Sequence, residues 1–126
     1  MTDWAAYLAD EIGRAFPDSP VYYLDPPYED SPSPYIRIGQ PDSTIKALKG
    51  ATRGQHHMNA YIWDSRVDHQ TQINQMLNEL TAVIDKALDK KNAILYQTRR
   101  TIGYDTNTAT TWIRGGLDFY FRTIGD

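Results

Sequence analysis

The fold is decided by two stretches, Pro34-Tyr35-Ile36-Arg37-Ile38-Gly39 and His57-Met58-Asn59-Ala60-Tyr61-Ile62-Trp63-Asp64. Each is rich in β-branched and aromatic residues, so each predicts a strand. Between them, residues 40–55 are mostly polar and longer than an ordinary connection in a small domain. We expect this segment to be an extended arm, with room for one short amphipathic turn around Ile45 and Leu48.

The bulk composition is that of a globular domain. A chain of 126 residues has the length of one domain, so we expect residues 1–126 to form a single unit that includes the arm. The absence of cysteine excludes a disulfide framework, thiol catalysis and a cysteine-based zinc site. The sequence has no secretory signal and no apolar run near the ~20 residues of a membrane span. We therefore expect a soluble protein with no membrane partner.

Charge is distributed unevenly along the chain. Residues 1–34 hold seven acidic residues and one basic residue, whereas residues 35–126 hold nine acidic and twelve basic residues. Opposite charge on two parts of one chain suits head-to-tail self-association, and chance scatter of solvated charge is an equal alternative. The sequence pI near 5.5 argues against a dedicated nucleic-acid binder.

Apolar residues at helical spacing predict two helices. The first covers residues 3–15, with Thr2 or Asp3 as its N-cap and with Asp10 and Glu11 facing solvent. The second follows Asp68 as its N-cap and carries one apolar stripe, which is typical of a helix that packs on a sheet. The stripe consists of Ile73, Met76, Leu77, Leu80, Val83, Ile84, Ala87 and Leu88.

The remaining β-rich segments complete an α+β fold. Residues 21–24 predict a short first strand, and residues 93–101 and 111–123 predict a long hairpin. Gly115-Gly116 interrupts the last strand and predicts a bulge. The expected order is α-β-β-β-α-β-β, with a mostly antiparallel sheet, helices on one face and the long arm between the second and third strands.

Residues that carry catalysis are scarce. His56, His57 and His69 are the histidines of the chain, and we interpret them as surface or hydrogen-bonding residues. A site of His57, His69 and Asp68 is the weakest alternative, since adjacent strand histidines point to opposite faces. The sequence contains no glycine-rich phosphate loop and no nucleophile elbow. We expect no enzymatic activity, no catalytic residue, no metal and no cofactor.

A small nucleic-acid-associated regulatory module is the alternative function. Its phosphate contacts would come from Lys46, Lys49 and Arg53 on the arm and from Arg99 and Arg100 on a strand. The two adjacent arginines point to opposite faces of that strand. Ordinary edge-strand charge, which protects a sheet from aggregation, is the simpler interpretation.

Aromatic residues are the remaining signal. Three Trp, nine Tyr and three Phe make up 12% of the chain. Tyrosine and tryptophan are favoured at protein interfaces. Four tyrosines exceed what the core needs, namely Tyr22, Tyr28, Tyr35 and Tyr120. This excess predicts an interaction surface.

The order of these motifs resembles the tail-completion proteins of long-tailed phages, the family of tail terminators and tail-to-head joining proteins. The matching features are an N-terminal helix, the strand Pro20-Val21-Tyr22, the stretch Pro34 to Gly39, the strand ending Ile62-Trp63-Asp64-Ser65, an amphipathic helix and a C-terminal hairpin. The resemblance covers nearly the whole chain and rests on order and spacing. Arg66-Val67 stands where the family pattern has a glycine.

This resemblance implies a non-enzymatic role in the virion, at the head-proximal end of the tail, with assembly in the host cytoplasm. It implies a ring of copies, expected to be a hexamer, that caps the tail tube or joins tail to head. The partners would be the tail-tube protein and the head connector protein. The genome would pass through the channel of the ring without specific binding.

The resemblance also implies two contact surfaces. The arm would contact a neighbouring subunit or ring through Asp42, Ile45, Lys46, Leu48, Lys49 and Arg53. A proline-rich loop would offer the second surface through Pro27, Tyr28, Glu29 and Asp30.

Overall fold

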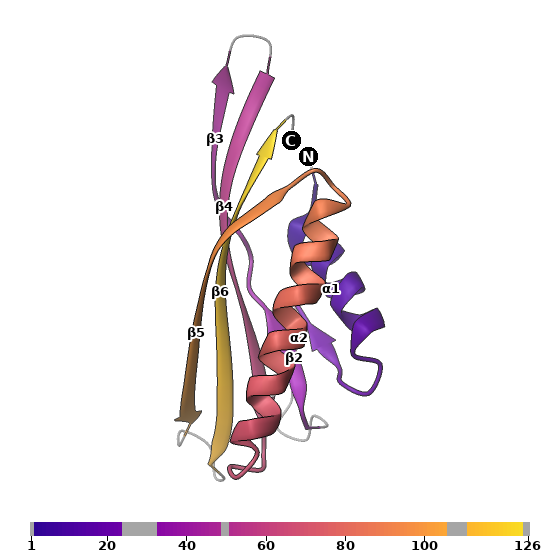
Figure 1. Ribbon diagram of the computed structural model, residues 1–126, viewed down its shortest axis with the longest axis vertical. Coiled ribbons are helices and arrows are strands. Elements are labelled where there is room, and N and C mark those ends of the chain that lie inside the picture. Colours follow the sequence, from indigo (N-terminus) through magenta and orange to yellow (C-terminus); the bar gives the residue numbers. More distant parts are fainter. Residues whose placement is uncertain (1, 24–32, 49–50, 106–110, 125–126) are drawn as a thin grey trace.

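The computed structural model describes residues 2–23, 33–48, 51–105 and 111–124, and in them two helices pack on one face of a six-stranded sheet (Figure 1). The elements in chain order are α1 (Trp4–Ala15), β1 (Val21–Tyr22), β2 (Tyr35–Ile38), β3 (Asp42–Leu48), β4 (Ala51–Asp64), α2 (Gln70–Asp89), β5 (Ile94–Asp105) and β6 (Trp112–Ile124). The predicted α+β class is confirmed. The described residues contain one strand more than predicted, because β3 forms inside the arm.

Strand β4 is the centre of the sheet. On one side it pairs with β6, which in turn pairs with β5. On the other side it pairs with β2 and then with β3, at successive positions along its length. Strand β1 pairs with β2 in parallel, and the other pairings are antiparallel. Strands β2 and β3 therefore share one side of β4.

Helix α1 begins at one of the two caps that the sequence predicts. The backbone N–H of Ala6 donates to the Asp3 carboxylate at 3.1 Å. The ring of Trp4 meets Phe121 of β6 edge-on, with 5.0 Å between the ring centroids. This contact fixes the start of α1 on the sheet, and the buried side chains of the helix enlarge the core: Trp4, Ala5, Leu8, Ala9 and Ile12.

Helix α2 carries the predicted apolar stripe. Its fully buried members are Ile73, Leu77, Leu80, Ile84, Ala87 and Leu88. The predicted N-cap Asp68 is wrong, because His69 occupies that position and its Nδ1 lies 2.8 Å from Asp64 Oδ2. After the helix, Asn92 has a φ of 56°, a left-handed conformation that asparagine tolerates well. This residue turns the chain into β5.

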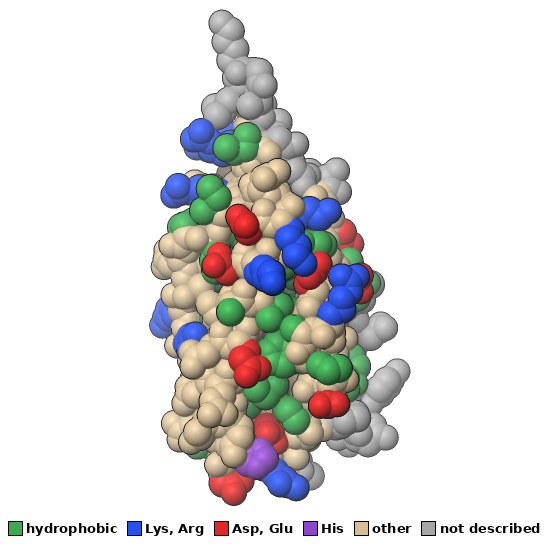
Figure 2. Space-filling model, turned by 45° about the vertical axis from the view of Figure 1, so that its right-hand side comes forward, with side chains coloured by type: hydrophobic (Ala, Val, Ile, Leu, Met, Phe, Trp, Pro, Cys, Tyr) green, Lys and Arg blue, Asp and Glu red, His purple; other side chains and the backbone are tan. Residues whose placement is uncertain are grey.

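The surface over the two helices mixes charges of both signs. Figure 2, which turns the right-hand side of Figure 1 toward the viewer, shows acidic and basic side chains interspersed there. Helices α1 and α2 together contain five acidic and two basic residues. Acidic residues thus outnumber basic ones on the helices themselves.

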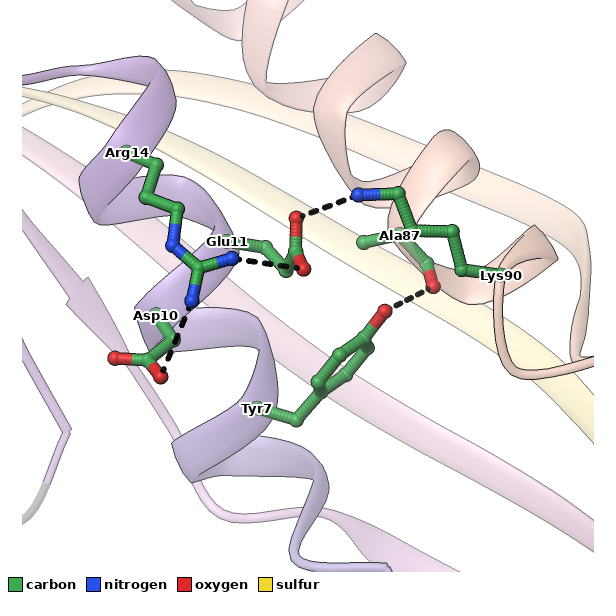
Figure 3. A network of polar contacts seen from close by, with 6 residues as sticks. All are labelled: Tyr7, Asp10, Glu11, Arg14, Ala87 and Lys90. Atoms are coloured by element: carbon green, nitrogen blue, oxygen red, sulfur yellow. Dashed lines mark hydrogen bonds and ion pairs between the residues drawn. The ribbon is translucent and has the colours of Figure 1, made fainter.

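A network of polar contacts joins α1 to the end of α2 (Figure 3). The Tyr7 hydroxyl donates to the carbonyl of Ala87 at 2.7 Å, and burial of this phenol raises its pKa. Lys90 Nζ donates to the Glu11 carboxylate at 3.1 Å, and Arg14 approaches the same carboxylate at 3.5 Å. The prediction that Glu11 faces solvent is wrong, because its side chain is 15% exposed and links the two helices.

Gly115 and Gly116 do not form the predicted bulge, since both pair in regular register with β4 and β5. The register shift lies instead in β5, between Leu95 and Gln97. A Cβ atom on Gly115 would lie 2.5 Å from Cγ2 of Ile73. The absence of a side chain there lets α2 approach the sheet closely.

Candidate assembly interface

The arm, residues 40–55, is present between the predicted strands, and most of it belongs to a β-hairpin. Strand β3 pairs residue by residue with the first half of β4, from Asp42 opposite His57 to Leu48 opposite Ala51. The expected amphipathic turn is therefore wrong, and the third predicted strand starts earlier than His57. Residues 42–46 are exposed on both faces of the hairpin. This explains why they lack the apolar alternation that marks a strand in sequence.

The hairpin extends beyond the rest of the sheet (Figure 1). Strand β6 accompanies β4 only as far as Arg53, which lies opposite Ile124. In the described ladder, Ala51 and Thr52 pair with β3 alone. The outer part of the hairpin is thus a two-stranded ribbon, which is marginally stable in water without further packing.

A buried histidine ties the base of the arm to the core. His56 Nδ1 lies 2.7 Å from Ser43 Oγ in β3, and its Nε2 lies 3.0 Å from Thr123 Oγ1 in β6. The ring is 4% exposed and stacks on Phe121 with 4.7 Å between centroids. The sequence offers one signal for this role. His56 lies two residues before the buried Met58, so the two side chains point to the same face of the strand.

The arm residues predicted to make contacts are exposed wherever their side chains are described. These are Asp42, Ile45, Lys46 and Arg53. The side chain of Leu48, the whole of Lys49 and the four loop residues lie outside the described part of the chain, the last being Pro27, Tyr28, Glu29 and Asp30. Their role in contacts stays a prediction.

One face of the sheet carries neither described helix, and we call it the helix-free face. Helix α2 packs on the face that holds Gly115, and α1 packs on the same face at Phe121. Residues alternate along a strand, so the intervening positions lie on the opposite face. Its aromatic residues, from the strand register and ring contacts, are Tyr22, Tyr35, Tyr61, Trp63, Tyr96, Trp112 and Tyr120. Three of the four tyrosines predicted to exceed the needs of the core lie on this face.

Two long strand edges of the sheet, β3 and β5, are open in the described residues, and the two-residue strand β1, which pairs there with β2 alone, is a third and short one. Strand β3 has β4 on one side and no strand on the other, and β5 has β6 on one side only. Four of the six large apolar side chains that are exposed in the described residues lie on these two strands: Ile45 on β3, and Ile94, Tyr96 and Tyr104 on β5. Long open edges pair readily with other chains.

The two long open edge strands run in opposite directions. Strands β3 and β6 are both antiparallel to β4, so they run the same way. Strand β5 is antiparallel to β6, and it therefore runs opposite to β3. If a second copy stands beside the first with the same end up, β3 of one copy lies next to β5 of the other, and these two strands are antiparallel.

The histidines outside the core do not share a site. His57 Nε2 lies 3.2 Å from Asp118 Oδ1 on the helix-free face, whereas His69 contacts Asp64 at the other end of β4. In the described ranges, no three His, Asp or Glu side chains are placed to hold a metal ion. Neither described helix has the length and apolarity needed to cross a membrane.

Asp64 joins three segments at the end of β4. Burial by itself would raise its pKa, but hydrogen bonds from the Arg66 N–H, His69 and Ser33 Oγ favour the carboxylate and hold the pKa below its usual value. The carboxylate is 3% exposed. We interpret this cluster as a structural clasp between β4, the start of α2 and the segment before β2.

Arg99 and Arg100 point to opposite faces, as predicted. Arg100 lies on the helix-covered side, where it donates hydrogen bonds to Asn78 and Thr81 of α2. Arg99 lies on the helix-free face, opposite Asp118 in the ladder. The five cations of the alternative nucleic-acid module therefore do not form one surface.

Comparisons with known proteins find similarity to solved structures and none to a family model or a curated sequence. A solved structure that it resembles is a chain of the "Virion of native gene transfer agent (GTA) particle", with 17% sequence identity and a TM-score of 0.48. The alignment covers 94% of this chain and 84% of that chain. At this TM-score the likeness carries no argument about function.

Proposed function

We propose that this chain is a structural protein of virion assembly, which caps a tail tube or joins tail to head as a ring of copies. The observation that carries the proposal is the pair of open edge strands, β3 and β5, which run in opposite directions. The resemblance of the sequence motifs to phage tail-completion proteins supplies the tail context. In this role the chain acts by binding and not by catalysis.

The two edges are suited to head-to-tail contacts. Rotation about an axis roughly along the strands brings β3 of one copy beside β5 of the next, with antiparallel direction. Such a contact uses two different surfaces on each copy, so it repeats until the rotation closes a ring. Backbone hydrogen bonds between edge strands supply affinity, and the exposed Ile45 and Ile94, which lie at nearly the same level along the strands, add apolar contact.

The outer part of the hairpin has a separate role. It extends past the end of β6, so edge pairing within one ring leaves it available for a second surface. We assign that surface to the tail-tube protein or the head connector protein. A polar ribbon of two strands gains the packing that it lacks when it docks on such a partner.

Electron microscopy of purified tail tubes with and without the protein tests this proposal. Capped tubes of limited length that bear a ring at one end are expected only when the protein is present. Tubes that lengthen and end identically in both samples would contradict the proposed function. The tube is included because it can template the ring, so the oligomeric state of the isolated protein does not decide the question.

A further inference from the structure

Cations are concentrated on the helix-free face. Six basic residues lie there, on β2, β3, β4, β5 and β6: Arg37, Lys46, Arg53, Arg99, Arg114 and Arg122. Among the described strand residues, the acidic ones on this face are Asp42, Asp105 and Asp118. The balance is opposite to that of α1 and α2, where acidic residues outnumber basic ones.

Two of these cations face each other directly. Lys46 of β3 lies opposite Arg53 of β4 in the ladder, and both side chains are exposed. Like charges at directly opposite positions destabilise a sheet. Arg122 adds a third cation on the adjacent strand, opposite Gln55, and it lines a shallow hollow with Arg53. An anion bound at this place would relieve the repulsion.

Aromatic rings lie between the cations of the face. The Arg114 guanidinium lies over the rings of Tyr61 and Trp63, at 5.3 and 5.4 Å from their centroids. Arg122 lies 4.4 Å from the centroid of Tyr96. The rings hold these two exposed guanidinium groups on the face, where their N–H groups can donate to phosphate oxygens.

We propose that the helix-free face binds the sugar–phosphate backbone of nucleic acid without sequence specificity. The binding surface belongs to each single chain. The place of this surface in the virion rests on the proposed function. In a ring that closes through β3 and β5 and has its helices on the outside, the helix-free face would line the channel. The acidic overall charge of the chain does not oppose such binding, since acidic residues outnumber basic ones on the helices of the opposite side.

Fluorescence anisotropy of the full chain with a labelled duplex of ~30 base pairs tests the proposal. If the six cations neutralise phosphates, affinity should fall on the order of 10³-fold between ~50 mM and ~200 mM salt. The variant Arg37→Glu with Arg122→Glu lies outside the arm and should weaken binding at least about tenfold. It should also lower the slope of log affinity against log salt by about 2.

The matched control is Arg14→Glu with Lys86→Glu, which changes the net charge equally on α1 and α2. This control should bind the duplex nearly as the wild type does. Equal loss in both variants, or no binding by the wild type at ~50 mM salt, would overturn the proposal even if rings still form. Salt-dependent binding without tube capping would support the face and contradict the proposed function. The wild type could instead self-associate at low salt and not bind the duplex. If the Arg37→Glu, Arg122→Glu variant alone lost that self-association, the face would be assigned to a second copy and the proposal would be overturned.

Discussion

Ser43 Oγ lies 2.7 Å from His56 Nδ1, and this contact joins the exposed arm to the buried core. The same ring reaches Thr123 and stacks on Phe121. Its neighbour His57 stacks on Tyr120 on the other face, where its side chain is 35% exposed. Two adjacent histidines therefore have different structural roles.

Replacing His56 should destabilise the protein far more than replacing His57. His56→Ala leaves a buried cavity and two hydroxyls without their partner, which should lower the free energy of unfolding by about 2–4 kcal/mol. His57→Ala should cost no more than about 1 kcal/mol, because its contact with Asp118 is half-exposed. Urea denaturation of both variants measures the difference. Equal losses would show that the His56 network does not anchor the arm.

A shortened arm should fold and fail to assemble. We would replace residues 45–54 by Asn-Gly, which favours a two-residue hairpin turn between Thr44 and Gln55 and keeps Ser43 beside His56. The removed side chains that are described are mostly exposed, so the free energy of unfolding should change by no more than about 2 kcal/mol. Tail tubes should remain uncapped in electron micrographs.

The double variant Asp18→Asn, Glu79→Gln, with exposed changes far from the arm in sequence, is the control for this experiment and should cap tubes normally. Loss of the fold on shortening the arm would assign residues 45–54 to the core. Normal capping by the shortened protein would remove the arm from the interface.

Patterns that report burial could be predicted from the sequence. The stripe of α2 depends on a periodic contrast between apolar and polar positions, and it was predicted correctly. β3 was missed because Ser43 and Thr44 are exposed, so its strand geometry depends on the ladder with β4 and not on a pattern of its own. The bulge was misplaced because Gly115 is required for the close approach of α2, which sequence spacing does not show.

The candidate site was predicted only in part, for the same reason. The exposure of Lys46 and Arg53 follows from a polar segment, and the structure agrees. The position of Arg122 beside them depends on the register between β4 and β6, which places Gln55 opposite Arg122. Register is a non-local property set by the whole sheet. No motif in the sequence joins these cations on one face.

A methyl group at Gly115 should be costly, whereas one at Gly103 should not. The Cβ of Gly115→Ala would lie 2.5 Å from the buried Ile73 Cγ2, so α2 or the sheet must shift. Overpacking of this kind should lower the free energy of unfolding by about 1–3 kcal/mol. A Cβ at Gly103 on β5 meets nothing described within 4 Å, so Gly103→Ala should stay within about 0.5 kcal/mol of the wild type. Thermal and urea unfolding of the two variants test the contrast, and equal stability of both would contradict close packing at Gly115.

Acid should destabilise the clasp at Asp64. Hydrogen bonds from Arg66, His69 and Ser33 hold the folded-state pKa of this carboxyl below its ordinary value of 3.8, although burial opposes them. The resulting stabilisation is fully present above the unfolded-state pKa and is lost as the pH falls through the lower folded-state pKa. The free energy of unfolding should therefore decline below about pH 4.

Asp64→Asn should lower the free energy of unfolding by about 1–3 kcal/mol at pH 7, because the amide cannot accept hydrogen bonds from all of the same donors. The variant should also lose part of the acid-dependent decline. Asp10→Asn, at an exposed position on α1, should keep the pH profile of the wild type. Urea unfolding from pH 7 to pH 2 measures all three proteins, and parallel curves for the wild type and Asp64→Asn would show that this carboxylate does not stabilise the fold.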